Sequence, residues 1–309
     1  AQGNLRSNST QGNITLDIDS DAGTIQARAN IDNKGYYTTH ITGKDINIAK
    51  AIPTSPLTRT DIILQAEGTI TDMQSLLSGK QGLTIPTGTF KGMATQTILM
   101  GYEYKNIQLN GAYSPHIYSG KITIDDPNGQ LNLQARYDES QLQPQYTAQI
   151  VADSINLHAL NLIDIHEGRS FSARLNGNIK GKQFNHMTGS IKIDSLTMHR
   201  EGDDYSINSI ALYSFESETK TLSLNSDFMN AAVKGDFTYQ TIMRSLLAHL
   251  HDYLPSLCPS HNHRHITSSN QCLVDLQIKD TEPLKELLLI PISIDKTASI
   301  VAQFYDESR

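Results

Sequence analysis

The chain has 309 residues, no tryptophan, and 25 basic against 32 acidic side chains, which gives a formal charge of −7. This balance disfavours a nucleic-acid partner, because neutralising phosphates requires a basic surface. Charged residues make up only 18% of the chain, against about a quarter in ordinary domains, so a charge-rich helical protein or a charged disordered tail is also disfavoured. The most apolar run covers residues 287–294, well short of the roughly 18 to 20 residues of a membrane-spanning helix.

In chain order, runs in which apolar and polar residues alternate recur between residue 14 and residue 278. This alternation predicts β-strands with one apolar face. Turn formers such as Asp21-Ala22-Gly23 and Asp126-Pro127-Asn128-Gly129 separate the runs, as in antiparallel hairpins. The residues predicted to line the apolar face are Ile14, Leu16, Ile18, Ile25, Ala27, Ile62, Leu64, Ile122, Ile124, Leu131, Leu133, Ile191, Ile193, Leu222, Leu224, Val274, Leu276 and Ile278.

Short helices are expected at residues 72–77, 157–163, 241–253 and 283–289, too few to cover so many strands. Either two sheets face one another in a sandwich, or a single sheet curls so that its apolar face lines an interior. Only 6% of the residues are aromatic, which leaves a sandwich of this size short of bulky core residues. We therefore predict an all-β, elongated, mostly antiparallel curled sheet with a few short helices.

The chain contains an internal repeat. Residues 37–48 (YTTHITGKDINI) align without gaps on residues 146–157 (YTAQIVADSINL), and neighbouring blocks keep a similar offset. A third, looser copy begins at Gln271. Repeats that join their apolar faces form a quasi-one-dimensional body. We expect a first repeat at 1–138, a second at 139–240, a helix and His/Cys loop at 241–270, and the start of a third repeat at 271–309.

The order of three phrases carries a family resemblance. They are residues 43–48 (GKDINI), residues 153–162 (DSINLHALNL) and residues 224–237 (LNSDFMNAAVKGDF), the last followed by an expected helix and by Tyr253-Leu254-Pro255. Over most of residues 20–305 the chain resembles TamB, the translocation and assembly module of Gram-negative envelopes, in its Bacteroidetes version and within the AsmA-like, bridge-like lipid transfer group.

The resemblance implies a taco-shaped β-groove in the periplasm that carries phospholipid acyl chains between the inner and outer membranes, supports outer-membrane protein assembly, or does both. It also implies two partners reached through parts of the protein not present here: the inner membrane, through an N-terminal anchor, and an outer-membrane barrel assembly protein of the TamA/BamA type. The first residues lack the basic and apolar regions of a signal peptide and no Met opens the chain, so we expect a mature or excised segment.

Three features invite a chemical interpretation. Cys258 and Cys272 flank His261, His263 and His265; a disulfide, two thiols in a loop, or a metal site all remain open, with the disulfide favoured in an oxidising compartment. The acidic pairs Asp125-Asp126 and Asp203-Asp204 stand beside turn residues, where Asp accepts backbone hydrogen bonds.

The expected helix at 241–253 either plugs the groove or simply covers apolar area on the sheet, and the second alternative is favoured. No catalytic motif is present in the sequence, so we predict that the chain is not an enzyme and needs no cofactor. The alternative function is a secreted or surface β-sandwich that binds polysaccharide or protein. Such glycan binders present aromatic platforms, whereas Tyr and Phe are dispersed along this sequence.

Overall fold

A computed structural model describes residues 2–7, 11–53, 55–70, 86–164, 166–242, 244–246, 270–288 and 297–305. Strands hold 69% of the described residues and helices 6%, and the strands form an antiparallel sheet that is not closed. The predicted all-β class, with antiparallel strands and a few short helices, is confirmed. With so little helix in the described residues, only a small part of the sheet can be covered by helices.

The chain divides into two compact units. Unit 1 comprises residues 1–142, 146–174 and 197–204, and unit 2 comprises residues 143–145, 175–196 and 205–309. The division passes through strands β12 (Ser170–Lys180), β13 (Thr188–Arg200) and β14 (Asp203–Glu216). The repeat boundaries given above concern sequence similarity and stay a prediction.

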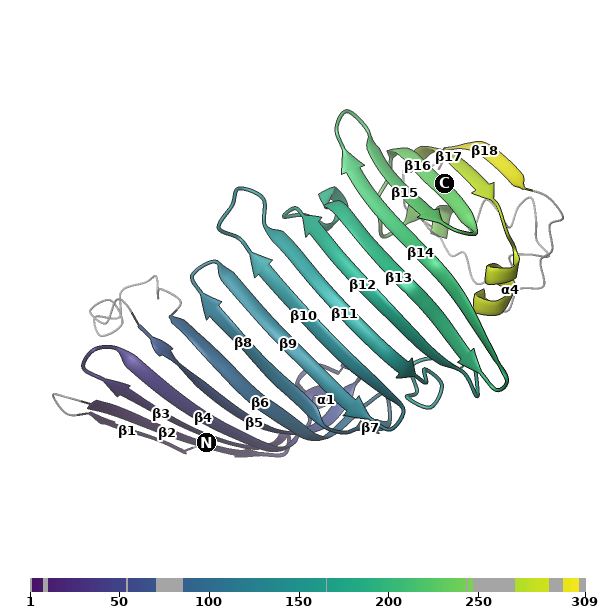
Figure 1. Ribbon diagram of the computed structural model, residues 1–309. Coiled ribbons are helices and arrows are strands. Elements are labelled where there is room, and N and C mark those ends of the chain that lie inside the picture. The colour runs from purple at the N-terminus through teal and green to yellow at the C-terminus, as the bar shows by residue number, and fades with distance from the viewer. Residues whose placement is uncertain are drawn as a thin grey trace. The chain divides into compact units, whose positions relative to one another are not determined.

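In unit 1, each strand from β1 to β6 pairs with the next, β6 pairs with both β7 and β8, and β8 to β10 continue the series (Figure 1). These pairings are all antiparallel, as short hairpins require. The strands are β1 (Gln2–Ser7), β2 (Gln11–Ser20), β3 (Gly23–Asp32), β4 (Tyr36–Ile46), β5 (Leu57–Thr69), β6 (Thr87–Leu99), β7 (Tyr102–Tyr104), β8 (Ile107–Ser114), β9 (Ile117–Asp126), β10 (Gly129–Asp138) and β11 (Gln145–Ile155).

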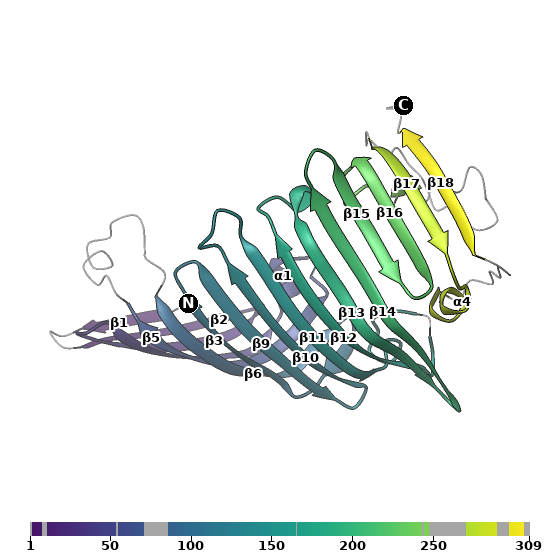
Figure 2. The ribbon, with the colours of Figure 1, turned by 45° about the horizontal axis from the view of Figure 1, so that its top comes forward.

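In unit 2, the strands from β14 to β18 pair in chain order and antiparallel (Figure 2). They are β14, β15 (Lys220–Ser226), β16 (Met229–Asp236), β17 (Gln271–Ile278) and β18 (Ala298–Tyr305). A 3₁₀ turn, Phe184–His186, precedes β13.

The hairpin turns follow the turn residues of the sequence. Gly23 and Gly129 open β3 and β10 with φ of 115° and 148°, a backbone conformation that residues with a Cβ rarely adopt. At the second of these turns, Asp126 is buried, and its carboxylate accepts hydrogen bonds from the backbone N–H of Asn128 at 2.9 Å and of Lys105 at 3.0 Å. The carboxylate of Asp126 therefore shapes the turn between β9 and β10.

The helices match the sequence prediction in part. Helix α4 (Glu282–Leu288) lies where a helix was expected at 283–289. Residues 157–163 were expected to be helical, but they form hydrogen-bonded turns instead; the N–H of Leu162 bonds to the carbonyl of Leu157 at 2.9 Å. In the expected helix 241–253, Ile242 and residues 244–246 are helical, and residues 247–253 lie outside the described residues, as does the turn expected at 72–77. A short helix not foreseen from the sequence, α1 (Ile48–Ala51), follows β4 and is capped by the side chain of Asn47.

Candidate functional site

The strand register of unit 1 places its predicted apolar residues on one face in two continuous rows, which we call the aliphatic rows. Residues directly opposite one another in an antiparallel pair project to the same side of the sheet. The first row, from β2 to β10, is Ile18, Ile25, Gly43, Ile62, Ala94, Ile107, Ile124 and Leu131; the second is Leu16, Ala27, Ile41, Leu64, Gly92, Leu109, Ile122 and Leu133.

Most of this apolar face is not buried. Ile14 and Leu16 are 46% and 37% exposed. The other predicted lining residues of unit 1 are half-buried, flanked by their neighbours in the sheet. Within unit 1, the described strands contribute to one sheet layer, and none of them forms a second layer over the aliphatic rows. A large contiguous apolar surface on a protein usually marks a site that binds a ligand, a membrane or another protein.

A row of tyrosines crosses the same face at the end of the strands where β8 turns into β9. We call it the tyrosine row; it consists of Tyr37, Tyr113, Tyr118, Tyr137 and Tyr146. The hydroxyls of Tyr37 and Tyr113 hydrogen-bond to one another across β5 and β6. They meet above Gly68 and Gly88, where an added Cβ would come within 3 Å of these hydroxyl oxygens.

The rest of the tyrosine row is held by stacking. The rings of Tyr118 and Tyr137 have centroids 6.0 Å apart, and those of Tyr137 and Tyr146 are 4.8 Å apart, with nearly parallel planes in both pairs. The Tyr137 hydroxyl donates to Glu139 at 2.8 Å, and this bond to a carboxylate is the main reason that its pKa is raised to about 12. Burial and the bond to Tyr113 raise the pKa of Tyr37, so both phenols stay neutral at ordinary pH.

Residues 156–163 lie at the opposite end of the strands, where β9 turns into β10. Leu160 is only 3% exposed, and its carbonyl accepts a hydrogen bond from the hydroxyl of the buried Tyr104 at 3.4 Å. The N–H of Asn156 bonds to the carbonyl of Asn128 at 2.8 Å. Buried Leu160 and Tyr104 therefore mark this end, and the tyrosine row marks the other.

In unit 2 part of the apolar face is covered. Val233 packs in a buried cluster with Phe237, Ile242 and Cys272. Leu222 and Val274, both predicted lining residues, pack against this cluster, as does Leu246. The segment that follows β16 thus covers part of the face, as favoured from the sequence. Leu224, Leu276 and Ile278 lie on the same side of β15 and β17 and are half-buried, as are Ile191 and Ile193 in β13.

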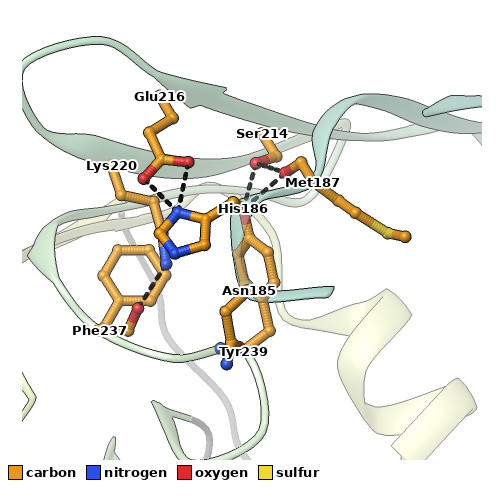
Figure 3. Close-up of polar contacts among 8 residues, drawn as sticks. All are labelled: Asn185, His186, Met187, Ser214, Glu216, Lys220, Phe237 and Tyr239. Carbon is orange, nitrogen blue, oxygen red and sulfur yellow. Dashed lines mark hydrogen bonds and ion pairs between the residues drawn. The ribbon is translucent and has the colours of Figure 1, made fainter. Parts of the chain in front are cut away.

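Lys220 lies at the edge of this covered region (Figure 3). It is only 7% exposed, and its Nζ donates to the carbonyl oxygen of Phe237 at 2.7 Å. The same nitrogen lies 5.2 Å and 5.0 Å from the ring centroids of Phe237 and Tyr239. Aromatic faces attract a cation at such distances, so the ammonium group links β15 to the segment that follows β16.

A second set of bonds in Figure 3 links that segment to the turn before β13. The hydroxyls of Ser214 and Tyr239 bond to one another, and each donates to the carbonyl of Met187 at 2.9 Å. Nδ1 of His186 lies 2.8 Å from Oε1 of Glu216. These bonds connect the segment after β16 to β14 and to the turn before β13.

The structure describes some, but not all, of the other residues for which the sequence suggested a chemical role. Cys272 is 4% exposed within the unit 2 cluster, while Cys258 and the three histidines near it lie outside the described residues, so the disulfide stays a prediction. Asp203 and Asp204 lie 3.4 Å from Arg200 and 3.1 Å from His199. Among the described residues, no group of three or more His, Cys, Asp or Glu side chains is placed to hold a metal ion.

Two parts of the apolar face were not among the residues predicted from the sequence. Ile41, Ile107 and Leu109 complete the aliphatic rows, and alternation within their strands could have identified them. The tyrosine row could not be found in this way. Its members are dispersed in sequence and meet only through the register of five strands.

Comparison with known proteins identifies no relative: no family model, no curated protein and no solved structure matches the chain. No helix within the described residues is both long enough and apolar enough to cross a bilayer.

Proposed function

We propose that the apolar face of unit 1 binds phospholipid acyl chains, and that the chain is a periplasmic section of a TamB-like envelope protein that carries phospholipid between the inner and outer membranes. The observation that carries the proposal is the pair of aliphatic rows that crosses eight strands without a covering layer from unit 1. Each CH₂ group removed from water contributes about 0.8 kcal/mol, so such a face holds an acyl chain without polar recognition.

The roles that extend beyond acyl-chain binding by this segment are supported by the family resemblance alone. Support for outer-membrane protein assembly, contact with a barrel protein of the TamA/BamA type, and attachment to the inner membrane belong to the full-length protein. Within the segment, binding of acyl chains requires no catalytic residue and no cofactor. The proposal therefore treats the chain as a conduit and not as an enzyme.

The polysaccharide-binding alternative gains one observation from the structure. The stacked rings of Tyr118, Tyr137 and Tyr146 form an aromatic strip, and exposed aromatic strips bind sugars. However, all three side chains are half-buried, and they border an aliphatic surface that sugar hydroxyls do not favour. Phospholipid fits the whole face, whereas a glycan fits only one end of it.

The proposal is tested by measuring phospholipid bound to the purified chain and to Leu133→Asp. Leu133 is the β10 member of the second aliphatic row and lies opposite Ile122. A carboxylate held against hydrocarbon costs more than the about 1.4 kcal/mol of a tenfold change. We therefore expect Leu133→Asp to retain at least about tenfold less phospholipid.

Gln134→Asp is the matched control, because Gln134 is the next residue of β10, is exposed and points to the opposite face. Its bound lipid should equal that of the unaltered chain, and circular dichroism should show that both variants keep the β-sheet. Equal lipid retention by a folded Leu133→Asp variant, or a lipid-free chain that binds polysaccharide, would reject the proposal.

A further inference from the structure

The two ends of the apolar face in unit 1 differ in how their tyrosines are bonded. At the β9–β10 end the hydroxyls of Tyr102 and Tyr104 bond to Asp126 and to the carbonyl of Leu160, whereas the tyrosine row lies at the other end. In β9, Tyr118 belongs to the tyrosine row and Ile124 to an aliphatic row, and both point to the same face because six residues separate them. At about 3.4 Å per residue this separation is about 20 Å. The buried Leu160 lies at the aliphatic end, and the tyrosine row occupies the other end.

These dimensions match one leaflet of a bilayer. The hydrocarbon core of a bilayer is about 30 Å thick, so the acyl chains of one leaflet extend over about 15 Å. The aliphatic rows and the small residues beyond them, such as Gly120 opposite Ala135, offer that length before the tyrosine row begins. Tyrosine is enriched at the level of lipid head groups because its ring is apolar and its hydroxyl is polar.

Tyr118 differs from its neighbours in the tyrosine row in the hydrogen bonding of its hydroxyl. Tyr37 and Tyr113 bond to one another, and Tyr137 bonds to Glu139. The hydroxyl of Tyr118 has no hydrogen-bond partner among the described residues, and its ring is fixed by stacking on Tyr137. It is therefore a positioned donor at the edge of an apolar surface.

On the basis of the proposed function, we infer that a bound phospholipid lies along the strands of unit 1, with its acyl ends toward Leu160 and its head group at the tyrosine row. In this arrangement, the Tyr118 hydroxyl donates to an ester or phosphate oxygen of the lipid. The neutral phenols of Tyr37 and Tyr137 avoid charge repulsion with the phosphate. The tyrosine row thereby sets one orientation for the lipid on a face that is otherwise non-directional.

The absence of tryptophan from the chain makes single-tryptophan reporters unambiguous. We would compare Tyr118→Trp with Ile124→Trp, which place one indole at each end of β9. Each is mixed with phosphatidylcholine that carries a nitroxide quencher either on the head group or at the end of an acyl chain. We expect the head-group label to quench the reporter at 118 more strongly, and the acyl-end label to quench the reporter at 124 more strongly.

Equal quenching at the two reporters by both lipids, or the reverse pattern, would overturn the inference while leaving acyl-chain binding intact. Absence of quenching at both reporters by both lipids would instead contradict the proposed function itself, and the inference with it. Circular dichroism of both reporters confirms that they are folded before either outcome is scored.

A second variant tests the hydroxyl without altering the ring. Tyr118→Phe should weaken lipid retention about two- to tenfold, the effect of one lost neutral hydrogen bond. Tyr36→Phe is the matched control, because Tyr36 bonds to Glu67 and belongs to the opposite face of β4. Unchanged retention by Tyr118→Phe, or an equal loss in Tyr36→Phe, would contradict the assigned role of Tyr118.

Discussion

Both units of this chain are built from strands with alternating apolar and polar residues, but the apolar face is exposed to a different degree in each unit. In unit 1, Ile14 and Leu16 on β2 are 46% and 37% exposed, and the aliphatic row that includes Leu16 crosses the sheet uncovered by other elements of the unit. In unit 2, Val233 on β16 is 8% exposed, because Phe237 and Ile242 pack over it. Alternation determines which side chains share a face. Whether that face is a core or a surface depends on the segment that follows the strand.

The cover in unit 2 is held by polar contacts as well as by apolar packing. Asn270, which is only 2% exposed, accepts a hydrogen bond from the N–H of Thr238 at 3.1 Å and donates to Ser245 at 2.8 Å. Lys220 and Tyr239 add the bonds described above. We interpret unit 2 as a region whose apolar face is used for stability, and unit 1 as a region whose apolar face is used for binding.

A matched pair of isoleucine truncations gives the largest expected contrast. Ile242→Ala removes a side chain that is 5% exposed, and such core truncations cost about 2 to 5 kcal/mol in the free energy of unfolding. Ile14→Ala removes the same atoms where nearly half the side chain is exposed, so we expect about 1 kcal/mol or less, mainly from lost strand propensity.

Urea unfolding of both variants measures the contrast directly. Similar losses in the two variants would show that the apolar face of unit 1 is buried as completely as that of unit 2. That result would remove the physical basis for lipid binding by unit 1.

The sequence predicts much of this fold for a simple reason. Period-two alternation is a local property, so Ile25 and Ala27 can be assigned to one face of β3 without knowledge of any other strand. Pairing each strand with the next then follows from the short turns. For these reasons the all-β class and most members of the aliphatic rows can be predicted from the sequence.

The features that distinguish the two units are not local. The contact of Tyr37 with Tyr113 joins residues separated by 76 positions and depends on the register of four strands. The burial of Lys220 depends on Phe237 and Tyr239 turning back over β15. Residues 157–163 were expected to be helical, but they form turns whose backbone bonds to residues outside the segment, such as the bond of the Leu160 carbonyl to Tyr104, depend on tertiary contacts.

Removal of the ammonium group of Lys220 should have an intermediate effect on the free energy of unfolding. Lys220→Met keeps the length and the apolar stem of the side chain, but it removes the hydrogen bond to the Phe237 carbonyl and the cation's attraction to two rings. A hydrogen bond to a charged group contributes about 1.5 to 3 kcal/mol, and relief from burying the charge offsets part of it. We expect a loss of about 1 to 2 kcal/mol in the free energy of unfolding.

Lys234→Met is the control for this change, because Lys234 is an exposed residue of the neighbouring strand β16. Chemical denaturation should show little change for Lys234→Met. An increase in stability for Lys220→Met would mean that burial of the charge opposes the cover on unit 2 instead of holding it in place.

The smallest effect concerns the tyrosine row at high pH. The hydrogen bond to Glu139 raises the pKa of Tyr137 to about 12, above the value of about 10 for an unfolded chain. The protonated phenol is therefore favoured in the folded state, and its contribution to stability is complete below about pH 10 and is lost as the pH rises toward 12. An absorbance titration of tyrosinate should show an ionisation near pH 12 that Tyr137→Phe lacks and that Glu139→Gln moves to lower pH. If Glu139→Gln leaves the titration unchanged, the carboxylate does not hold the phenol neutral, and the tyrosine row is ordered by stacking alone.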